Sequence, residues 1–207
     1  MRYIHYGCGL DAPDGWVNFD ASPSLALQKI PVLGPLIKSV SKVQWPANVR
    51  YGDITRKLPG VPHGSAKGVY CSHVLEHLSL EDFRKALQNT YLSLAEGGIF
   101  RMVIPDLEYH IRIYQSSNDD EKAIHFMKDT ILGVEKRKKG IRSVMEHMLG
   151  NSKHLWMWDF NSLKVELERV GFKEIRKCEP GDSSDPNFKL VENPARFRAS
   201  VAIECHK

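Results

Sequence analysis

A short glycine turn and two acidic residues are the first candidates for chemistry in this chain. Gly7-Cys8-Gly9 follows a short apolar run, Asp20 closes the next such run, and Asp53 comes just after a third. Glycines let the backbone approach a ligand because no Cβ stands in the way, and a carboxylate at a strand end can accept both hydroxyls of a ribose. Since parallel strands share one carboxyl edge, the pattern favours a nucleoside with its ribose at Asp20 and an adenine amino group at Asp53. Each acid alone is also typical of a turn or a helix cap.

The run His73-x-x-Glu76-His77 spells the inverted zinc-protease motif. That chemistry requires two histidines one helical turn apart within a helix, so that both point at the metal. Here a strand-like run reaches almost to His73 and Ser79 is a good N-cap, which puts the motif in a strand-to-helix turn. The sequence therefore predicts no metal. It makes His73 the first candidate general base and His77 the second, because histidine titrates near neutral pH. Capping of the next helix is the alternative for His77, and is preferred for Glu76.

Aromatic and polar side chains gather in a later stretch and form a candidate substrate site. Rings can stack on the C–H faces of a sugar while polar groups bind its hydroxyls. The candidate substrate-binding residues are Asp106, His147, His154, Trp156 and Trp158. The two tryptophans are equally typical of a buried core. The basic run Lys136-Arg137-Lys138-Lys139 in the same stretch is expected to be a solvated loop, with contact to an anionic substrate as the second interpretation.

The elements that must position these residues alternate between strand-like runs and helical stretches, which is typical of a mostly parallel sheet covered on both faces. We expect an α/β fold, a Rossmann-like doubly wound sheet of seven strands with the last strand antiparallel. The expected strands are Tyr3–Tyr6, Trp16–Phe19, Val49–Tyr51, Gly68–Cys71, Ile99–Ile104, Ile175–Cys178 and Ala199–Glu204. Apolar periodicity predicts a helix over Leu80–Leu94 with Ser79 as its N-cap, and another from about Ser162 to Val170 that ends at Gly171.

Two stretches lie outside this repeating framework. Ser22–Pro46 contains four prolines and is expected to be a surface excursion with one short helix. The insertion 106–159 begins past the fifth strand, where open parallel sheets bind ligands, and is expected to form a helical lid. We accordingly expect a single domain, 1–207, made of a cofactor-binding framework (1–105), the lid (106–159) and a C-terminal helix and strands (160–207).

The composition agrees with a single globular domain, since the 207 residues are 42% hydrophobic and 26% charged. A net charge of +4 permits an anionic substrate but falls short of the basic patches that nucleic-acid binding requires. The cysteines form no C-x-x-C pair, which argues against disulfides and a thiolate zinc site, and Cys71 and Cys205 are expected to be buried. With no secretory signal and no apolar run that could span a bilayer, a cytoplasmic location is expected.

Five short motifs follow one another along the first half of the chain: Gly7-Cys8-Gly9, Trp16-Val17-Asn18-Phe19-Asp20, Gly52-Asp53, Ser72-His73-Val74-Leu75-Glu76-His77-Leu78 and Gly97-Gly98. In this order they resemble the motifs of class I S-adenosylmethionine-dependent methyltransferases, in particular small bacterial members associated with cell-surface polysaccharide synthesis. The run from Ser72 is the most specific, and Trp156–Phe172 is similar to a later segment of that family. The resemblance implies S-adenosylmethionine as the cofactor and in-line methyl transfer, most consistent with a sugar or glycan hydroxyl as acceptor.

The resemblance also implies which residues hold the cofactor. The glycines of the turn would approach its methionine part, Asp20 its ribose, Asp53 its adenine, and Cys71-Ser72 its far side. The implied cofactor-binding residues are Gly7, Cys8, Gly9, Asp20, Ala21, Asp53, Ile54, Cys71 and Ser72.

One departure from the family matters. Most members have a full helix between the glycine turn and the second strand, whereas here only Leu10 to Gly15 intervene, which is too short for one. The cofactor would lose one wall, and we expect the excursion Ser22–Pro46 to replace it.

Three other functions compete with methyl transfer. Gly7-x-Gly9-x-x-Ala12 formally satisfies the fingerprint of NAD-dependent oxidoreductases, but Pro13-Asp14-Gly15 breaks the helix that must hold a pyrophosphate. A catalytically silent nucleoside-binding scaffold would keep the same glycines and acids without an acceptor site. Nucleic acid as methyl acceptor ranks last, because no stacking platform is evident.

Overall fold

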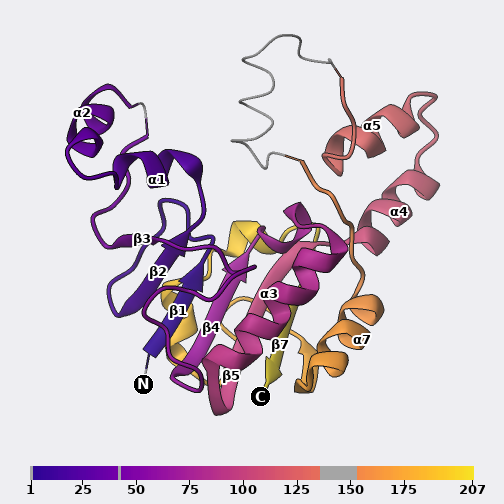
Figure 1. Cartoon of the computed structure of the whole chain (residues 1–207). Coiled ribbons are helices and arrows are strands. Elements are labelled where there is room, and N and C mark those ends of the chain that lie inside the picture. Colours follow the sequence, from indigo (N-terminus) through magenta and orange to yellow (C-terminus); the bar gives the residue numbers. More distant parts are fainter. Residues whose placement is uncertain (1, 42, 136–152) are drawn as a thin grey trace.

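A computed structural model describes residues 2–41, 43–135 and 153–207 and shows one seven-stranded sheet in the order β3-β2-β1-β4-β5-β7-β6 (Figure 1). Strands β3, β2, β1, β4 and β5 pair in parallel, and β7 is antiparallel to both β5 and β6. The strands are β1 (Arg2–Tyr6), β2 (Trp16–Asp20), β3 (Val49–Tyr51), β4 (Ala66–Ser72), β5 (Leu94–Pro105), β6 (Lys173–Lys177) and β7 (Ser200–His206). The expected seven strands and the antiparallel last strand are confirmed.

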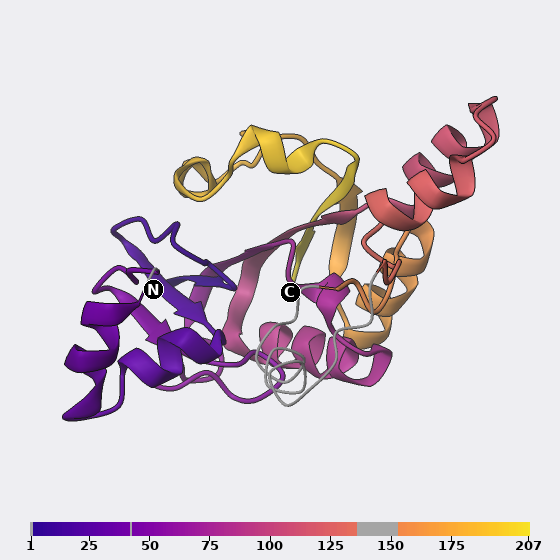
Figure 2. The ribbon, with the colours of Figure 1, turned by 90° about the horizontal axis from the view of Figure 1, so that it is seen from above.

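Two amphipathic helices, α3 (Leu80–Ser93) and α7 (Phe160–Val170), cover one face of the sheet (Figure 2). The Ser79 side chain caps α3 by accepting a hydrogen bond from the Asp82 amide, and α7 ends at Gly171, whose φ of 112° suits glycine. Their apolar sides pack with inward residues of β1, β4 and β5 in the main core. Both helices agree with the predicted ones to within a residue or two.

The opposite face is covered by residues 178–199, which contain two short 3-10 helices, η2 (Pro186–Leu190) and η3 (Pro194–Phe197) (Figure 2). Phe188 from η2 is fully buried and forms a second core with Trp16 and Tyr70. This side of the sheet therefore carries an irregular strap in place of long helices.

Arg101 fastens this strap to the sheet. Its side chain, on β5, is 1% exposed and contacts the carboxylates of Asp182 at 2.9 Å and of Glu192 and Glu204 at 2.6 Å. It also donates to the Glu179 carbonyl oxygen at 2.9 Å. Because three acids and a carbonyl surround one buried guanidinium, the strap is held by a charged network in addition to apolar contacts.

The excursion after β2 is more ordered than expected and contains two helices, α1 (Pro23–Gln28) and α2 (Leu33–Val40). The prediction of one short helix is therefore wrong. Leu25 of α1 and Trp45 pack with Cys8 of the glycine turn, and the Trp45 ring N–H donates to the Ser24 hydroxyl at 3.2 Å. The structure describes all residues between β1 and β2 and shows no helix there, which agrees with the short connection. That the excursion replaces a wall of the cofactor site stays a prediction.

Two helices follow β5, α4 (Leu107–Ser116) and α5 (Lys122–Asp129), and they extend beyond the carboxyl edge of the sheet (Figure 1). The basic run at 136–139 and the candidate residue His147 lie outside the described residues. Among the helices that the structure describes, none is both long and apolar enough to cross a membrane.

All four cysteines are free and buried. Burial is the main cause that raises the pKa of the Cys8 and Cys178 thiols to about 12, and it raises the pKa of Cys71 and Cys205 as well. Their expected role as small apolar residues is confirmed for Cys71 and Cys205, which lie in the main core.

We predict that His5, a buried residue of β1, makes the fold sensitive to mild acid. Burial, with a smaller effect of Arg196, lowers its pKa from 6.5 to about 3. Between pH 6.5 and pH 3 the unfolded chain binds a proton at His5 that the folded chain does not bind. The free energy of unfolding is therefore highest above pH 6.5 and falls as the pH is lowered from 6.5 to 3. At about pH 5 the free energy of unfolding should be about 2 kcal/mol lower because of this residue. Urea unfolding of His5→Phe should show that part of the pH dependence removed, whereas exposed His63→Phe should retain it.

Candidate functional site

The glycine turn after β1 is left-handed at both glycines, with φ values of 63° at Gly7 and 56° at Gly9. A Cβ on Gly7 would stand 2.2 Å from the Val74 Cγ2 atom, whereas a Cβ on Gly9 would meet nothing within 4 Å. Gly7 is therefore required by internal packing. Gly9 instead presents bare backbone to open space, as a ligand-binding glycine must.

Asp20, at the end of β2, is buried and joins this turn to the next segment. Its Oδ2 atom accepts the Gly9 N–H at 2.9 Å and its Oδ1 atom accepts the Ser22 N–H at 2.7 Å. A carboxylate has about four acceptor positions, so each oxygen keeps one for a ribose hydroxyl. Ala21, between these contacts, is exposed.

Asp53, just past β3, stabilises a turn with its side chain, which is the structural role that the sequence offered as an alternative to adenine binding. Its Oδ1 atom accepts both the Thr55 N–H at 2.9 Å and the Thr55 hydroxyl at 2.8 Å. Ile54 is buried in the main core, and its carbonyl oxygen accepts the Asn89 side-chain N–H at 2.8 Å. The Asp53 carboxylate thus has a structural role, and its contact with adenine stays a prediction.

The end of β4 lies next to the glycine turn, through Val74. The Cys71 side chain is in the core, so any contact of this residue with a cofactor would come from its backbone. The Ser72 hydroxyl is buried without a hydrogen-bond partner among the described residues, and its carbonyl oxygen accepts an Arg196 N–H at 3.3 Å.

Beyond Val74, the 3-10 helix η1 (Leu75–His77) holds Glu76 in the centre of a histidine cluster. The nearest ring nitrogens of three histidines lie 3.4 Å (His73), 3.9 Å (His77) and 3.9 Å (His154) from the Glu76 Oε1 atom. The position of the motif in a strand-to-helix turn is confirmed, because α3 begins only after Ser79. Sequence reasoning treated Glu76 as a cap and His154 as a separate substrate residue, and did not join them.

The backbone explains how this cluster is assembled. His73 has a left-handed φ of 54°, which a histidine rarely adopts, and its Nε2 atom lies 2.8 Å from the Arg196 carbonyl oxygen on the strap. The Leu155 and Trp156 amides both donate to the Glu76 carbonyl oxygen, at 2.8 and 3.2 Å, which brings the preceding residue, His154, against the Glu76 side chain.

The environment shifts two of these histidines in opposite directions. Burial alone would lower the pKa of His73, but its approach to Glu76 and its hydrogen bond to the Arg196 carbonyl raise that pKa above the ordinary value. For His154 burial prevails over the charge of Glu76, and its pKa is lowered.

The remaining candidate substrate residues differ in exposure. Trp158 is 3% exposed and stacks on Phe83 at 4.2 Å, so its alternative interpretation as a core residue is confirmed. Trp156 is 41% exposed, and its ring lies 6.0 Å from the Trp158 ring, centroid to centroid. Asp106 caps α4 by accepting the Glu108 N–H at 2.9 Å, and it forms a β-bridge with Trp158.

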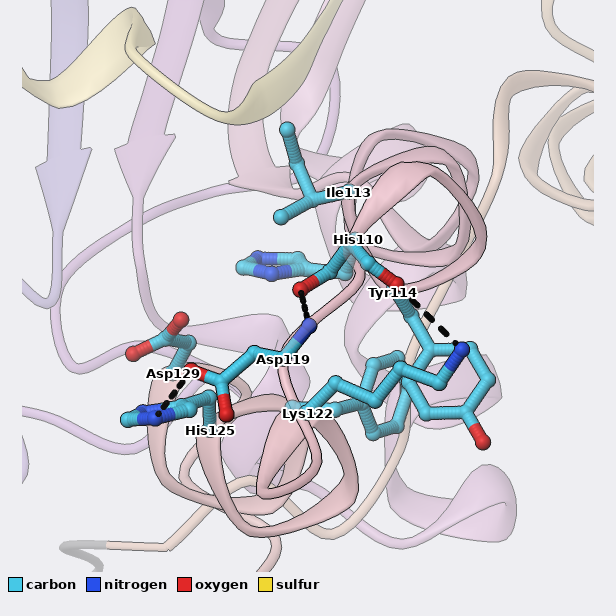
Figure 3. A pocket seen from close by; sticks show the side chains of 9 residues that line it. His110, Ile113, Tyr114, Asp119, Lys122, His125 and Asp129 are labelled. Carbon is cyan, nitrogen blue, oxygen red and sulfur yellow. Dashed lines mark hydrogen bonds and ion pairs between the residues drawn. The ribbon is translucent and has the colours of Figure 1, made fainter.

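A pocket of about 330 Å³ lies between α4 and α5 (Figure 3). Its lining includes His110, Tyr114 and Lys122, together with an ion pair of 3.3 Å between His125 and Asp119. None of the sequence-predicted site residues that the structure describes lines it. This pocket is therefore separate from the glycine turn and from the histidine cluster.

Comparison with known proteins agrees with the architecture. The sequence matches no protein-family model and no curated protein sequence. Among solved structures, a SAM-dependent methyltransferase from Archaeoglobus fulgidus is 18% identical, with a TM-score of 0.51 over 100% of this chain and 86% of that chain. A Thermotoga maritima protein described as a possible histamine N-methyltransferase is 14% identical, with a TM-score of 0.52 over 100% and 82%. The CurJ carbon methyltransferase is 12% identical, with a TM-score of 0.50 over 100% and 48%. These likenesses show that the Rossmann-like fold is shared with methyltransferases.

Proposed function

We propose that this chain is a methyltransferase that uses S-adenosylmethionine and methylates a hydroxyl of a sugar or glycan precursor. One observation carries the proposal: bare backbone at Gly9 faces open space directly beside the buried Asp20 carboxylate, at the carboxyl edge of the sheet. Parallel sheets bind nucleosides at this edge. The resemblance of the ordered motifs and the shared fold both support the same function.

The residues present fit this cofactor. Asp20 retains acceptor positions for the ribose hydroxyls, and the Gly9 backbone can lie against the methionine part without a side chain between them. When bound, S-adenosylmethionine supplies an electrophilic methyl group. The excursion packs against the turn through Leu25 and Trp45, and it would take the place of the helix that most of the family has after the glycine turn.

A sugar acceptor is supported by the groups near the same edge. Trp156, which is 41% exposed, carries a ring that can stack on a sugar face, and it stands two residues after His154 of the histidine cluster. His73 is the proposed general base. Its Nε2–H donates to the Arg196 carbonyl, which leaves Nδ1 as the nitrogen to take up the proton. Nδ1 lies 3.4 Å from the Glu76 Oε1 atom, whose negative charge would stabilise the imidazolium that forms.

We predict that Asp20→Asn binds S-adenosylhomocysteine about 10–100-fold more weakly than the wild type, because charge-assisted hydrogen bonds to the ribose are lost. Isothermal titration of the purified chain measures this. Asp11→Asn, an exposed acid in the same connection, is the matched control and should bind as the wild type does. Thermal unfolding of each variant shows whether the turn is still folded.

The acceptor needs a second measurement, namely cofactor-dependent methylation of a panel of sugar phosphates and nucleotide sugars, with Trp156→Ala as the variant. Wild-type protein that binds no S-adenosylhomocysteine would refute the proposal as a whole. Tight binding without methylation of any acceptor would instead identify a silent scaffold.

A further inference from the structure

Glu76 carries a carboxylate in a place where an unpaired charge is costly. Its side chain is 0% exposed, and neither of its oxygens has a hydrogen-bond partner among the described residues. Within the same residues no lysine or arginine forms an ion pair with it; its only charged neighbours are imidazoles. A buried carboxylate without hydrogen bonds costs several kcal/mol unless a cation compensates it.

The hydrogen bond of His77 determines what this ring offers to Glu76. The His77 Nδ1 atom lies 2.9 Å from the Lys153 carbonyl oxygen, which can only accept, so Nδ1 carries the proton. The Nε2 atom of His77, 3.9 Å from the Glu76 Oε1 atom, is then the ring nitrogen left to bind a cation. A cation held by both atoms would also compensate the buried carboxylate. A ring N–H that donates to a backbone carbonyl is also the usual support of a metal-binding histidine.

His154 completes a compact donor group. Its Nε2 atom lies 3.9 Å from the Glu76 Oε1 atom, and the donor atoms of Glu76, His77 and His154 are all within 4.8 Å of one another. A metal bound to all three at about 2.1 Å would place them about 3.4 Å apart in a tetrahedral arrangement. Small side-chain shifts suffice to reach that spacing from the observed one.

We propose that Glu76, His77 and His154 bind a divalent transition-metal ion. Two imidazoles and one carboxylate suit zinc, cobalt or manganese better than calcium or magnesium, which prefer oxygen ligands. The motif was set aside at the sequence level because its two histidines do not share a helix. In the structure the second imidazole ligand is His154, which takes the place of the motif's first histidine and lies 77 positions after His77 in the sequence.

The site is built from rigid parts. Glu76 and His77 are adjacent on η1, and the segment that carries His154 is fixed by two amides that donate to the Glu76 carbonyl. Val74, which directly precedes η1, lies against Gly7 of the glycine turn. An ion bound at Glu76 and His77 would therefore lie near the proposed cofactor site. An ion there could bind the acceptor oxygen and lower the pKa of its hydroxyl; this use, unlike metal binding itself, rests on the proposed function.

The test is titration of the chelator-treated full chain with zinc and with cobalt, by calorimetry and by the cobalt absorption spectrum. We expect one equivalent to bind, and a loss of affinity of about 100-fold or more in Glu76→Gln and in His154→Gln, since even outer contacts of metal sites are worth about 10–100-fold. His63→Gln changes an exposed histidine outside the cluster and should bind like the wild type.

Thermal unfolding gives a second criterion that does not depend on affinity. The comparison is made at a pH above the raised pKa of His73, where no imidazolium of His73 pairs with Glu76. There, metal-free Glu76→Gln should be at least as stable as the wild type because a buried charge is removed, and only the wild type should gain stability when zinc is added. Three results would overturn the proposal: no stoichiometric binding of zinc or cobalt, binding unchanged in both variants, or a clear loss of metal-free stability in Glu76→Gln, which would mean a histidinium–carboxylate pair. S-adenosylhomocysteine binding to the metal-free protein is measured separately, so its failure would refute the proposed function and leave the metal result intact.

Discussion

Arg101→Met is expected to lower the free energy of unfolding by about 3–5 kcal/mol, because it leaves buried carboxylates without their cation. The side chains of Glu192 and Glu204 are only 2% and 4% exposed and both contact the guanidinium. Methionine fills much of the space but cannot neutralise them. The loss should appear as a lower midpoint in urea unfolding, and the strap 178–199 should become sensitive to protease before the rest of the chain.

Arg176→Met is the matched control, because Arg176 contacts two of the same acids, Asp182 and Glu204, from a position that is 42% exposed. Exposed ion pairs contribute about 1 kcal/mol or less, so this variant should lose little. Equal losses in the two variants would show that burial does not decide the contribution of Arg101.

Gly7→Ala is expected to cost about 2–4 kcal/mol, the sum of a left-handed backbone strain and a steric clash. The added Cβ would lie 2.2 Å from the Val74 Cγ2 atom, in a turn packed against η1 and β4. Gly9→Ala has a similar φ but open space around its Cβ, so only the strain of about 1–2 kcal/mol applies. Chemical unfolding of both variants measures the difference.

The double variant Gly7→Ala/Val74→Ala separates the two contributions. Removal of the Val74 methyl groups should recover the steric part and leave the backbone part, so that the pair is not additive. Gly7→Ala should lose more stability than Gly9→Ala, whereas Gly9→Ala should lose more affinity for S-adenosylhomocysteine. Gly9→Ala, with its methyl in the space proposed for the cofactor, should fold well and bind S-adenosylhomocysteine weakly. If Gly7→Ala proves as stable as Gly9→Ala, the packing role of Gly7 is refuted.

The sequence predicted the parts of the fold that depend on local patterns. Strand spacing, the apolar face of α3 and its Ser79 cap are all determined by residues within one element. The excursion was harder, because its prolines were treated as helix breakers. Pro23 stands at the start of α1 and Pro35 in the first turn of α2, where proline needs no N–H partner and favours a helix.

Contacts between distant residues were beyond the reach of these patterns. In the sequence, Arg101 is a single charged residue within an apolar strand. In the structure, acidic residues 81 to 103 positions later in the chain contact its guanidinium. The same holds for Glu76, whose neighbour His154 lies near the end of the insertion 106–159. The motif His73-x-x-Glu76-His77 was the available signal for that cluster, and the requirement for a regular helix led to its dismissal.

The burial of all four thiols has a kinetic consequence. A thiol reagent can attack only after the element that covers a cysteine opens, so each modification rate measures an opening equilibrium. Cys8 is covered by Leu25 and Trp45, so its modification rate reports how often the excursion separates from the glycine turn. Cys71 and Cys205, in central strands, sample nearly complete unfolding. One unmodified chain thus contains separate probes of local and global motion, and a ligand at the turn would slow the reaction of Cys8 first.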